Sequence, residues 1–471
     1  MTILVCALVA SPLAAQIGRR FPSERKIVND PVTGVPLTFL TSSQGNGDSK
    51  IYPTHHQWTS DGQWVIFRSS RAPGQAMAVN ETTGDMVQVT EAGFQGMLCI
   101  ADHSMTLYFL RSPRLPGAGS AVAAPVPPPV AAAPPAPGAP GTKGGRGGRS
   151  GGPRGPAQII AVDLAKLFAD SAAGKLKAST EYERVRATMP MEMGAPGDMA
   201  LDPTEEFAYV RVGREEAAKH LPADTKIEAP FGPRAMGAGP TGLVSVNLKT
   251  GEIKFIVAVP FQIGHVQTNP WMPGEIVFCW ETGGKAPQRT WTVKADGTGL
   301  RPLWPEATYD WVTHEAVITQ DEVAIAILAH RRPGVPATDA WGQSSTGEFP
   351  TGLGIVNLRT REMRIVGQVP MGNPGRSVWH VNGSPDGRWA VADDFRYRLW
   401  LVDRRSGEMA VLADLGQKTT AADHIHPTFN ADSTKIEIQS AMLSTDNRSL
   451  NIVVVPVPKS WLARSYPEKI Q

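Results

Sequence analysis

Residues 383–412 read GSPDGRWAVADDFRYRLWLVDRRSGEMAVL, and this stretch decides the fold. It opens with a Pro-Asp-Gly turn, after which apolar residues follow in the pattern of a β-strand. The part from residue 399 onward reads as two more strands, joined at Ser406 and Gly407, where a tight hairpin needs a residue with positive φ. The stretch therefore predicts consecutive antiparallel strands separated by tight turns.

Both parts of this stretch recur along the chain. The turn followed by an apolar strand is found again at 58–70, 200–212, 269–280, 317–328 and 429–440. The hairpin is found again at 77–89, 243–256, 290–303 and 353–366. With a degenerate copy around 96–168, the chain holds about seven copies spaced by roughly 40 residues. Because four-stranded units at this period are typical of β-propellers, we predict an all-β, seven-bladed propeller of four-stranded antiparallel blades.

The composition agrees with a turn-rich β protein. The 471 residues include 47 Gly, 41 Pro and 12 Trp, a balance that favours sheets over helical bundles. The formal charge of +2 and the charged fraction of 19% give no general nucleic-acid-binding surface, so we expect no nucleic-acid partner. Seven blades would fill residues 51–460, and no G-x-S-x-G elbow follows the last of them, which argues against a propeller-gated serine peptidase.

Residues 1–15 form a short apolar run that ends in small residues, as in a secretory signal peptide. No Lys or Arg precedes the run, and a buried N-terminal strand is the alternative. We expect a periplasmic or secreted protein. The cysteines left after cleavage would be Cys99 and Cys279, so we expect two buried thiols and no disulfide scaffold. No later segment reaches the roughly 18 consecutive apolar residues of a membrane span.

The remaining segments surround or interrupt the predicted propeller. Residues 16–50 form an N-terminal segment, and residues 461–471 form a C-terminal tail. Residues 113–156 are rich in Pro and Ala, then in Gly and Arg, and cannot pack a core. Because strand patterns flank them on both sides, we interpret 113–156 as a disordered insertion between two strands of one sheet.

Histidines lie near the start of the first strand in four of the predicted blades. They are His265, His314, His380 and the pair His424 and His426. The innermost strands of a propeller line its centre, so these side chains would converge. Positions i and i+2 of an extended strand point to the same side, so His424 and His426 would face the centre together. Such a group could bind a divalent metal, or it could bond to backbone groups at the rim.

The order of these motifs resembles that of the oligogalacturonate lyases of polysaccharide lyase family 22. The shared features are GHVQTNPWMPGEIVFCW from residue 264, THEAV from 313, WHVNGSPDG from 379 and the late H-x-H pair. The resemblance covers most of residues 260–440, and the first half of the chain matches only as generic blades apart from IYPTHHQWTSDGQWVIF, which starts at residue 51. It implies a seven-bladed propeller that cleaves short pectin fragments by β-elimination with a Mn²⁺ ion.

The resemblance also implies roles for individual residues. His380, His424 and His426 would be the metal ligands, Arg289 the Brønsted base, and His314 a second catalytic residue. The fourth metal ligand of the family is a glutamine whose position here is occupied by Ala421, so that Gln417, Asp423 or water would replace it. We expect His265 and Gln267 to contact the sugar, with a purely structural role as the alternative.

The chemistry of uronate elimination suits these residue types. The C5 proton of a uronate becomes acidic when the charge on the adjacent carboxylate is neutralised, and a divalent cation held by neutral imidazoles can do this. His314 has the right pKa to remove the proton near neutral pH. Arg289 normally stays protonated, and its fork suits a carboxylate clamp. Both residues therefore remain candidates for the base.

Three other functions are compatible with the sequence. The protein could be a lyase for another uronate polymer, such as ulvan, glucuronan or rhamnogalacturonan. It could be a TolB-like, non-catalytic binding propeller of the cell envelope, in which the histidines hold no metal. A glycoside hydrolase would need two carboxylates at a set separation, and no spacing in the sequence singles out such a pair.

Overall fold

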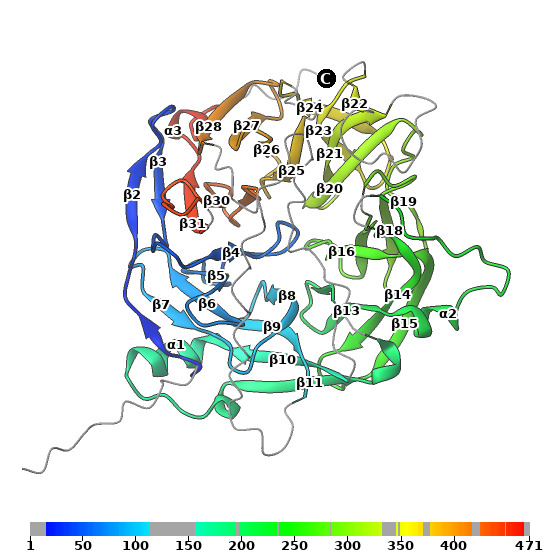
Figure 1. The fold of residues 1–471 in the computed structure, drawn as a ribbon, viewed down its shortest axis with the longest axis horizontal. Helices are drawn as coiled ribbons and strands as arrows, with labels where there is room; N and C mark the ends of the chain where they lie inside the picture. The colour runs from blue at the N-terminus through cyan, green and yellow to red at the C-terminus, as the bar shows by residue number, and fades with distance from the viewer. Residues whose placement is uncertain are drawn as a thin grey trace, which may run out of the picture.

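The computed structural model describes residues 16–113, 156–194, 197–232, 235–282, 284–331, 345–346, 349–370, 377–416, 424–447 and 449–465. These residues form seven antiparallel sheets arranged in a ring (Figure 1). This confirms the predicted all-β, seven-bladed propeller. No helix within the described ranges is long and apolar enough to cross a membrane. The predicted signal peptide and nearly all of the predicted insertion lie outside the described residues.

Blades one to three lie within residues 20–261. Their strand orders are β1-β7-β6-β5-β4, β11-β10-β9-β8 and β12-β13-β14-β15. β9 pairs directly with β10, so the chain between them connects neighbouring strands of one sheet. The strands are β1 (Arg20–Phe21), β4 (Asp48–Lys50), β5 (Trp64–Ser69), β6 (Gln75–Asn80), β7 (Met86–Gln88), β8 (Gln95–Ile100), β9 (Thr106–Arg111), β10 (Ala157–Asp163), β11 (Glu183–Met189), β12 (Met199–Leu201), β13 (Phe207–Val212), β14 (Ala238–Asn247) and β15 (Ile253–Phe261).

Blades four to six follow the same pattern. Their strand orders are β16-β17-β18-β19, β20-β21-β23-β24 with β22 added on β21, and β25-β26-β27-β28. The strands are β16 (Ile263–Thr268), β17 (Glu275–Trp280), β18 (Thr290–Lys294), β19 (Arg301–Pro302), β20 (Asp310–Thr319), β21 (Glu322–Arg331), β22 (Ser345–Thr346), β23 (Gly352–Asn357), β24 (Met363–Gly367), β25 (Val378–Gly383), β26 (Trp389–Asp394), β27 (Arg398–Asp403) and β28 (Met409–Asp414).

Blade seven joins the two ends of the chain and closes the ring. Its order is β2-β3-β31-β30-β29, and Thr38 of β3 lies opposite Val454 of β31. Residues 16–50, which the sequence places ahead of the propeller, thus supply the outer strands of blade seven as well as β1 and β4 of blade one. The strands of blade seven are β2 (Lys26–Asn29), β3 (Pro36–Phe39), β29 (Thr428–Phe429), β30 (Lys435–Ser440) and β31 (Asn451–Pro456).

The helices are short, and those labelled in Figure 1 lie at the periphery of the ring. They are α1 (Leu164–Ala172), α2 (Arg214–Ala218) and α3 (Lys459–Leu462), with the 3-10 turns η1 (Ser179–Glu181) and η2 (Met191–Met193).

The repeated hairpin turns have a local cause. The side-chain oxygen of Asn80 accepts hydrogen bonds from the backbone N–H groups of Thr82 and Thr83 at 3.1 and 2.9 Å. Gly84 then takes a left-handed conformation with φ +75°. A side-chain oxygen at the first turn position combined with a residue of positive φ produces a tight turn between two strands. The same arrangement recurs at Asn247, Asn357 and Asp403.

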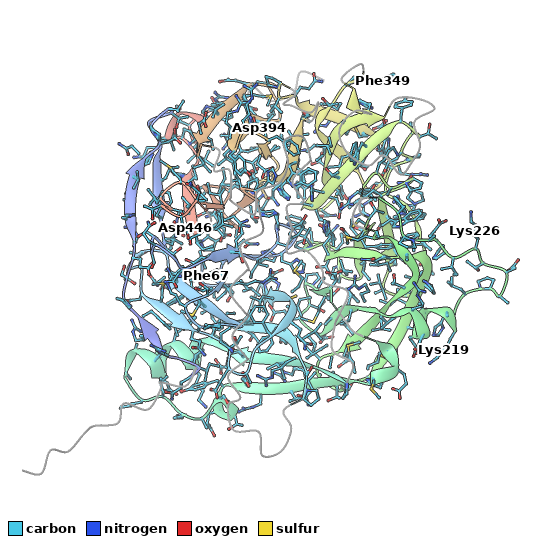
Figure 2. All side chains as sticks on the ribbon, viewed as in Figure 1. Phe67, Lys219, Lys226, Phe349, Asp394 and Asp446 are labelled. Carbon is cyan, nitrogen blue, oxygen red and sulfur yellow. The ribbon has the colours of Figure 1, made fainter. Side chains whose placement is uncertain are left out.

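The core consists of apolar side chains packed within and between the blades, and Figure 2 shows the described side chains on the ribbon. Blades five and six illustrate it, because Ile318, Leu353, Val381 and Val402 from both of them form one buried cluster. The first strands β16, β20, β25 and β29 of successive blades lie next to one another. The packed blades therefore hold these inner strands, and the residues they carry, close to the axis of the ring.

A buried ion pair joins blades one and seven. Lys50 Nζ lies 3.4 Å from Glu437 Oε2, and neither side chain is more than 1% exposed. Burial raises the pKa of Glu437 from 4.5 to about 7, although Lys50 opposes the rise. The folded protein therefore binds a proton at Glu437 more tightly than the unfolded chain does. This contribution to stability is fully present at low pH and is lost as the pH rises from about 4.5 to about 7.

Glu437 should contribute a fall of at most about 3 kcal/mol in the free energy of unfolding between about pH 4.5 and pH 7. Buried histidines with lowered pKa values, such as His380 and His426, contribute a rise over the range below about pH 6.5. The contribution of Glu437 is therefore the difference between the wild type and Glu437→Gln, which does not ionise, and this difference should fall as the pH rises. The exposed Glu252 offers a matched control, because Glu252→Gln should leave the dependence unchanged. Urea unfolding at a series of pH values measures how the free energy of unfolding changes with pH. The same change with pH in the wild type and in Glu437→Gln would contradict the raised pKa of Glu437.

Candidate active site

The predicted histidines come together at the inner edges of blades four to seven. His265 lies in β16, His314 in β20 and His380 in β25, and His426 precedes β29. The ring centroids of His380 and His426 are 3.7 Å apart, and those of His314 and His380 are 4.2 Å apart. The ring of His265 lies 5.8 Å from that of His314. Four consecutive blades thus contribute one imidazole each to what we call the histidine cluster.

The backbone at three of these histidines is left-handed. His265, His314 and His426 have φ values of +50°, +38° and +54°. The pairings of β16 with β17 and of β20 with β21 shift register at His265 and His314, which marks β-bulges there. A non-glycine residue with positive φ carries a conformational cost, and bulges redirect side chains next to active sites. The propeller therefore stores backbone strain where its histidines meet.

The pair His424 and His426 differs from the extended strand that the sequence predicts. β29 begins only two residues after His426, and the positive φ of His426 breaks the two-residue alternation. His426 packs against His380, whereas His424 stacks on Tyr397 with 5.3 Å between the ring centroids and lies 5.7 Å from His380. Ile425 is buried in the apolar core, as expected.

Asp393 orients His380. Its carboxylate accepts a hydrogen bond from His380 Nδ1 at 3.0 Å and another from the His380 backbone N–H at 2.6 Å. The backbone N–H groups of Ile425 and His426 also donate to this carboxylate, at 3.0 and 3.3 Å. Because Nδ1 of His380 carries the proton, its Nε2 has a free lone pair. A carboxylate behind Nδ1 is the usual support of a metal-binding histidine.

The charge state of the cluster also suits a metal. Burial, reinforced by the neighbouring His426, lowers the pKa of His380 well below its usual value. Burial lowers the pKa of His426 to about 3, although Asp393 opposes the shift. Both imidazoles are therefore neutral at physiological pH, as metal ligands must be.

Gln439 fixes both members of the H-x-H pair. Its amide nitrogen donates to the His424 carbonyl at 2.9 Å and lies 2.8 Å from His426 Nδ1. An amide nitrogen donates, so His426 Nδ1 accepts here and the proton of a neutral ring lies on Nε2. For His426 Nε2 to bind a metal, the Gln439 amide must rotate so that its oxygen accepts a hydrogen bond from Nδ1 instead. The positions that the sequence suggested for a fourth ligand, Gln417 and Asp423, lie outside the described residues.

We expect Asp393→Asn to weaken Mn²⁺ binding by about 10- to 100-fold, because an amide holds the Nδ1 proton of His380 less firmly than a carboxylate. Equilibrium dialysis against Mn²⁺ measures the affinity. The exposed Asp296 provides a control, since Asp296→Asn should bind Mn²⁺ like the wild type. Equal affinity in the wild type and in Asp393→Asn would show that Asp393 does not support a ligand.

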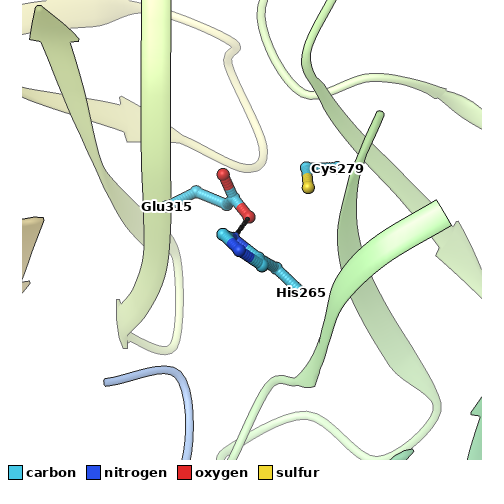
Figure 3. A group of neighbouring side chains, drawn as sticks. All are labelled: His265, Cys279 and Glu315. Atoms are coloured by element: carbon cyan, nitrogen blue, oxygen red, sulfur yellow. Dashed lines mark hydrogen bonds and ion pairs between the residues drawn. The ribbon is translucent and has the colours of Figure 1, made fainter. Parts of the chain in front are cut away.

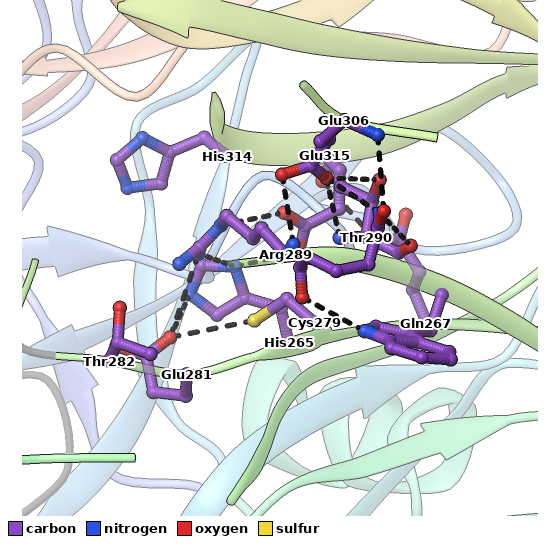
Figure 4. Close-up of polar contacts among 12 residues, drawn as sticks. His265, Gln267, Cys279, Glu281, Thr282, Arg289, Thr290, Glu306, His314 and Glu315 are labelled. Carbon is purple, nitrogen blue, oxygen red and sulfur yellow. Dashed lines mark hydrogen bonds and ion pairs between the residues drawn. The ribbon is translucent and has the colours of Figure 1, made fainter. Parts of the chain in front are cut away.

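An ion-pair network adjoins the histidine cluster (Figure 4). Glu315 Oε1 lies 2.9 Å from His265 Nδ1, and Glu315 Oε2 lies 3.3 Å from Arg289 Nε. Glu281 Oε2 lies 3.4 Å from His265 Nε2 and 3.6 Å from Arg289 Nη2. One buried and one partly buried carboxylate therefore balance one guanidinium and one histidine.

Part of this network also has the spacing of a metal site. Donor atoms of His265, Cys279 and Glu315 lie within 4.8 Å of one another (Figure 3). However, burial raises the pKa of the Cys279 thiol well above its usual value. Burial alone would lower the pKa of His265, but Glu315 outweighs it and raises that pKa. Both groups therefore keep their protons, and Arg289 occupies the second oxygen of Glu315, so these residues suit an ion-pair network better than a metal.

Arg289 is buried and charged. Burial by itself would lower the pKa of its guanidinium, but Cys279 and the carboxylates of Glu315 and Glu281 raise it above the ordinary value. Glu306 fixes the backbone here, because its carboxylate accepts a hydrogen bond from the Arg289 N–H at 2.9 Å. The sequence gives no sign of this support, since Glu306 lies in a loop outside the repeat.

The side chain of His314, unlike that of Arg289, is uncharged. Burial, followed by the positive charge that His380 and Arg289 can carry, lowers its pKa well below the usual value. Its Nδ1 donates to the backbone carbonyl of Trp379 at 2.6 Å. The imidazole is therefore neutral with a lone pair on Nε2, and Figure 4 shows the guanidinium of Arg289 extending toward the side on which His314 lies.

Gln267 is hydrogen-bonded to backbone groups of the next blade. Its amide nitrogen donates to the Glu315 carbonyl at 3.1 Å, and its amide oxygen accepts the Val317 N–H at 2.8 Å. Gln267 thereby ties blade four to blade five. The sequence left two roles for Gln267, contact with the sugar and structural support, and this geometry favours structural support.

The comparisons with known proteins concern the fold. The sequence matches no protein-family model and no curated relative. An oligogalacturonate lyase in complex with manganese has a TM-score of 0.65 at 18% identity, covering 95% of this chain and 100% of the other. An oligogalacturonate lyase from Vibrio parahaemolyticus has a TM-score of 0.65 at 16% identity with the same coverage. In fold, the chain is therefore similar to two oligogalacturonate lyases over nearly its whole length.

Proposed function

We propose that the protein is a polysaccharide lyase that cleaves uronate-containing oligosaccharides, such as pectin fragments, by metal-assisted β-elimination. The observation that carries the proposal is the histidine cluster, with His380 oriented by Asp393 and with the charged Arg289 close by. The cluster combines positive charge with a neutral base, and β-elimination from a uronate needs both. The fold is that of two lyases with such a substrate in their names.

We assign the metal to His380, His424 and His426, and we propose Mn²⁺. One of the two similar structures is a complex with manganese. When bound, the ion supplies positive charge beside the uronate carboxylate and so makes the C5 proton more acidic. His380 and Asp393 would hold it with a preset Nε2, and Gln439 would hold the backbone of the H-x-H pair.

Of the two candidate bases, we propose His314. Its neutral imidazole has a free Nε2 lone pair and can take the C5 proton of the substrate. Arg289 is held protonated by Glu315 and Glu281, so its role in this proposal is to bind the uronate carboxylate and stabilise the negative charge that develops during proton removal. This departs from the base that the resemblance implies.

The substrate class and the location of the protein follow from the same proposal. A uronate oligosaccharide is the proposed partner, and the apolar residues 1–15 support a periplasmic or secreted enzyme. Ulvan, glucuronan and rhamnogalacturonan fragments carry the same reactive uronate unit, so the residues assigned here would serve for them as well.

Mass spectrometry of the products tests the reaction class. The protein should split a panel of uronate oligosaccharides, in the presence of Mn²⁺, into two products whose masses add up to that of the substrate, because elimination adds no water. Products that together gain one water would indicate a hydrolase. Binding of the oligosaccharides without any product would indicate a binding propeller.

A further inference from the structure

Tyr52 reaches the centre of the histidine cluster from a different blade. It follows β4 in blade one, on the other side of the ring closure from blade seven. Its ring centroid lies 4.6 Å from that of His265, 5.5 Å from His426, 6.2 Å from His380 and 6.4 Å from His314. Tyr52 is thus in or near contact with every member of the cluster, although it lies in a separate stretch of the sequence, IYPTHHQW from residue 51.

The hydroxyl of Tyr52 is buried and, among the described residues, has no hydrogen-bond partner. Buried polar atoms are nearly always paired, so an unpaired hydroxyl beside a candidate active site needs an explanation. The backbone around Tyr52 is firmly held. The His55 N–H donates to the Tyr52 carbonyl at 3.1 Å, and Asn382 of blade six donates to the Pro53 carbonyl at 3.2 Å. The backbone that carries the phenol is therefore held, and the O–H is left for a group that binds in the site.

The other proton donors nearby are already engaged. Both ring nitrogens of His265 face carboxylates, and the Cys279 thiol is directed at Glu281 at 3.6 Å. Arg289 is held by its two carboxylates. The remaining step of the proposed reaction is protonation of the oxygen that leaves C4, and the residues assigned so far do not provide for it.

We propose that Tyr52 is the catalytic acid that donates its hydroxyl proton to the departing glycosidic oxygen. This inference rests on the proposed lyase function. In the step, the C5–H proton moves to His314 Nε2, and the C5–H electron pair becomes the second bond between C4 and C5. The C4–O bond breaks, its electron pair stays on the oxygen, and that oxygen takes the proton of Tyr52. Solvent then returns a proton to Tyr52 and removes one from His314.

The phenol is in its acid form before the reaction, because a tyrosine hydroxyl has a pKa of about 10 and keeps its proton at neutral pH. The hydroxyl therefore holds its proton until negative charge develops on the leaving oxygen, which is a much stronger base than the carboxylates around it.

The test compares Tyr52→Phe with the wild type on two substrates. One is a saturated uronate oligosaccharide, and the other is a uronoside with fluoride at C4, whose leaving group needs no proton. We expect kcat on the oligosaccharide to fall by about 10²- to 10⁴-fold, with kcat on the fluoride substrate falling less than about tenfold. Equal losses on both substrates, or no loss on either, would overturn the role of Tyr52.

Two further measurements separate this role from a structural one. Tyr52→Phe removes an unpaired buried hydroxyl, so its melting temperature should be no lower than that of the wild type. In the matched control Tyr209→Phe, the lost hydroxyl bonds to Asp202 at 2.8 Å outside the site, so stability should fall while turnover is kept. If the wild type eliminated fluoride but cleaved none of the oligosaccharides, the acid role of Tyr52 would also be overturned. If the wild type were inactive on both substrates, the lyase function itself would be overturned.

Discussion

Alanine in place of His380 is expected to lower Mn²⁺-dependent uronate cleavage by about a thousandfold. His380 is the ligand that the structure orients best, because Asp393 holds its Nδ1 and leaves its Nε2 free. A Lewis-acid metal contributes several kcal/mol to a transition state, and each 1.36 kcal/mol changes the rate tenfold. Kinetic assays at saturating Mn²⁺, with metal content measured on the same samples, give both the rate and the binding.

His330 provides the matched control for His380. It is also a buried histidine, but its Nε2 bonds to the backbone carbonyl of Pro350 at 2.9 Å, and it is not one of the clustered rings. His330→Ala should therefore lose stability to a similar degree while keeping metal and activity. If His380→Ala retained wild-type activity and metal content, the metal site would have to be elsewhere.

Replacing Arg289 with alanine is expected to affect both stability and activity. Arg289 is 5% exposed and neutralises Glu315 and Glu281, so its loss leaves the buried Glu315 and the partly buried Glu281 without their partner. Removing one member of a buried ion pair typically costs about 3–5 kcal/mol. Turnover should fall as well, since the carboxylate clamp is lost. Denaturant unfolding and steady-state kinetics measure the two effects.

The ion pair of Arg111 and Glu183 provides a control that separates the loss of stability from the loss of turnover. It is also buried, with two hydrogen bonds of 3.0 and 2.9 Å, but it links β9 to β11 in blade two. Arg111→Ala should therefore lower stability to a similar extent without the loss of turnover that is specific to Arg289. Full activity in Arg289→Ala would contradict any role of this residue in the reaction.

The fold could be predicted because the blades repeat the same local sequence pattern of strands and tight turns. The hairpin can be recognised in the sequence because Asn80, Gly84 and their counterparts build the turn within a few residues. The outer strands of blade seven could not be predicted, because β3 pairs with β31 from the far end of the chain, β2 pairs only with β3, and neither strand resembles any part of the repeat. The ring closure depends on contacts between distant segments rather than on local pattern.

The candidate site was only partly predictable for the same reason. The sequence showed the histidines because they recur at one position of the blade. It did not show the roles of Tyr52, Gln439 and Asp393, since each acts on a partner that only the closed ring, or the neighbouring strand, brings close. The two-residue rule also failed at His426, where a left-handed backbone replaces the extended strand.

One measurement tests the central claim most directly: the rate at which the new C4–C5 double bond appears, followed by its ultraviolet absorbance. Metal-stripped protein would be assayed on a panel of saturated uronate oligomers, first without Mn²⁺ and then after Mn²⁺ is restored. The account predicts a rate near background without metal and a large increase with Mn²⁺ that a chelator reverses. The same rate with and without metal, or no double bond on any oligomer, would contradict metal-assisted β-elimination.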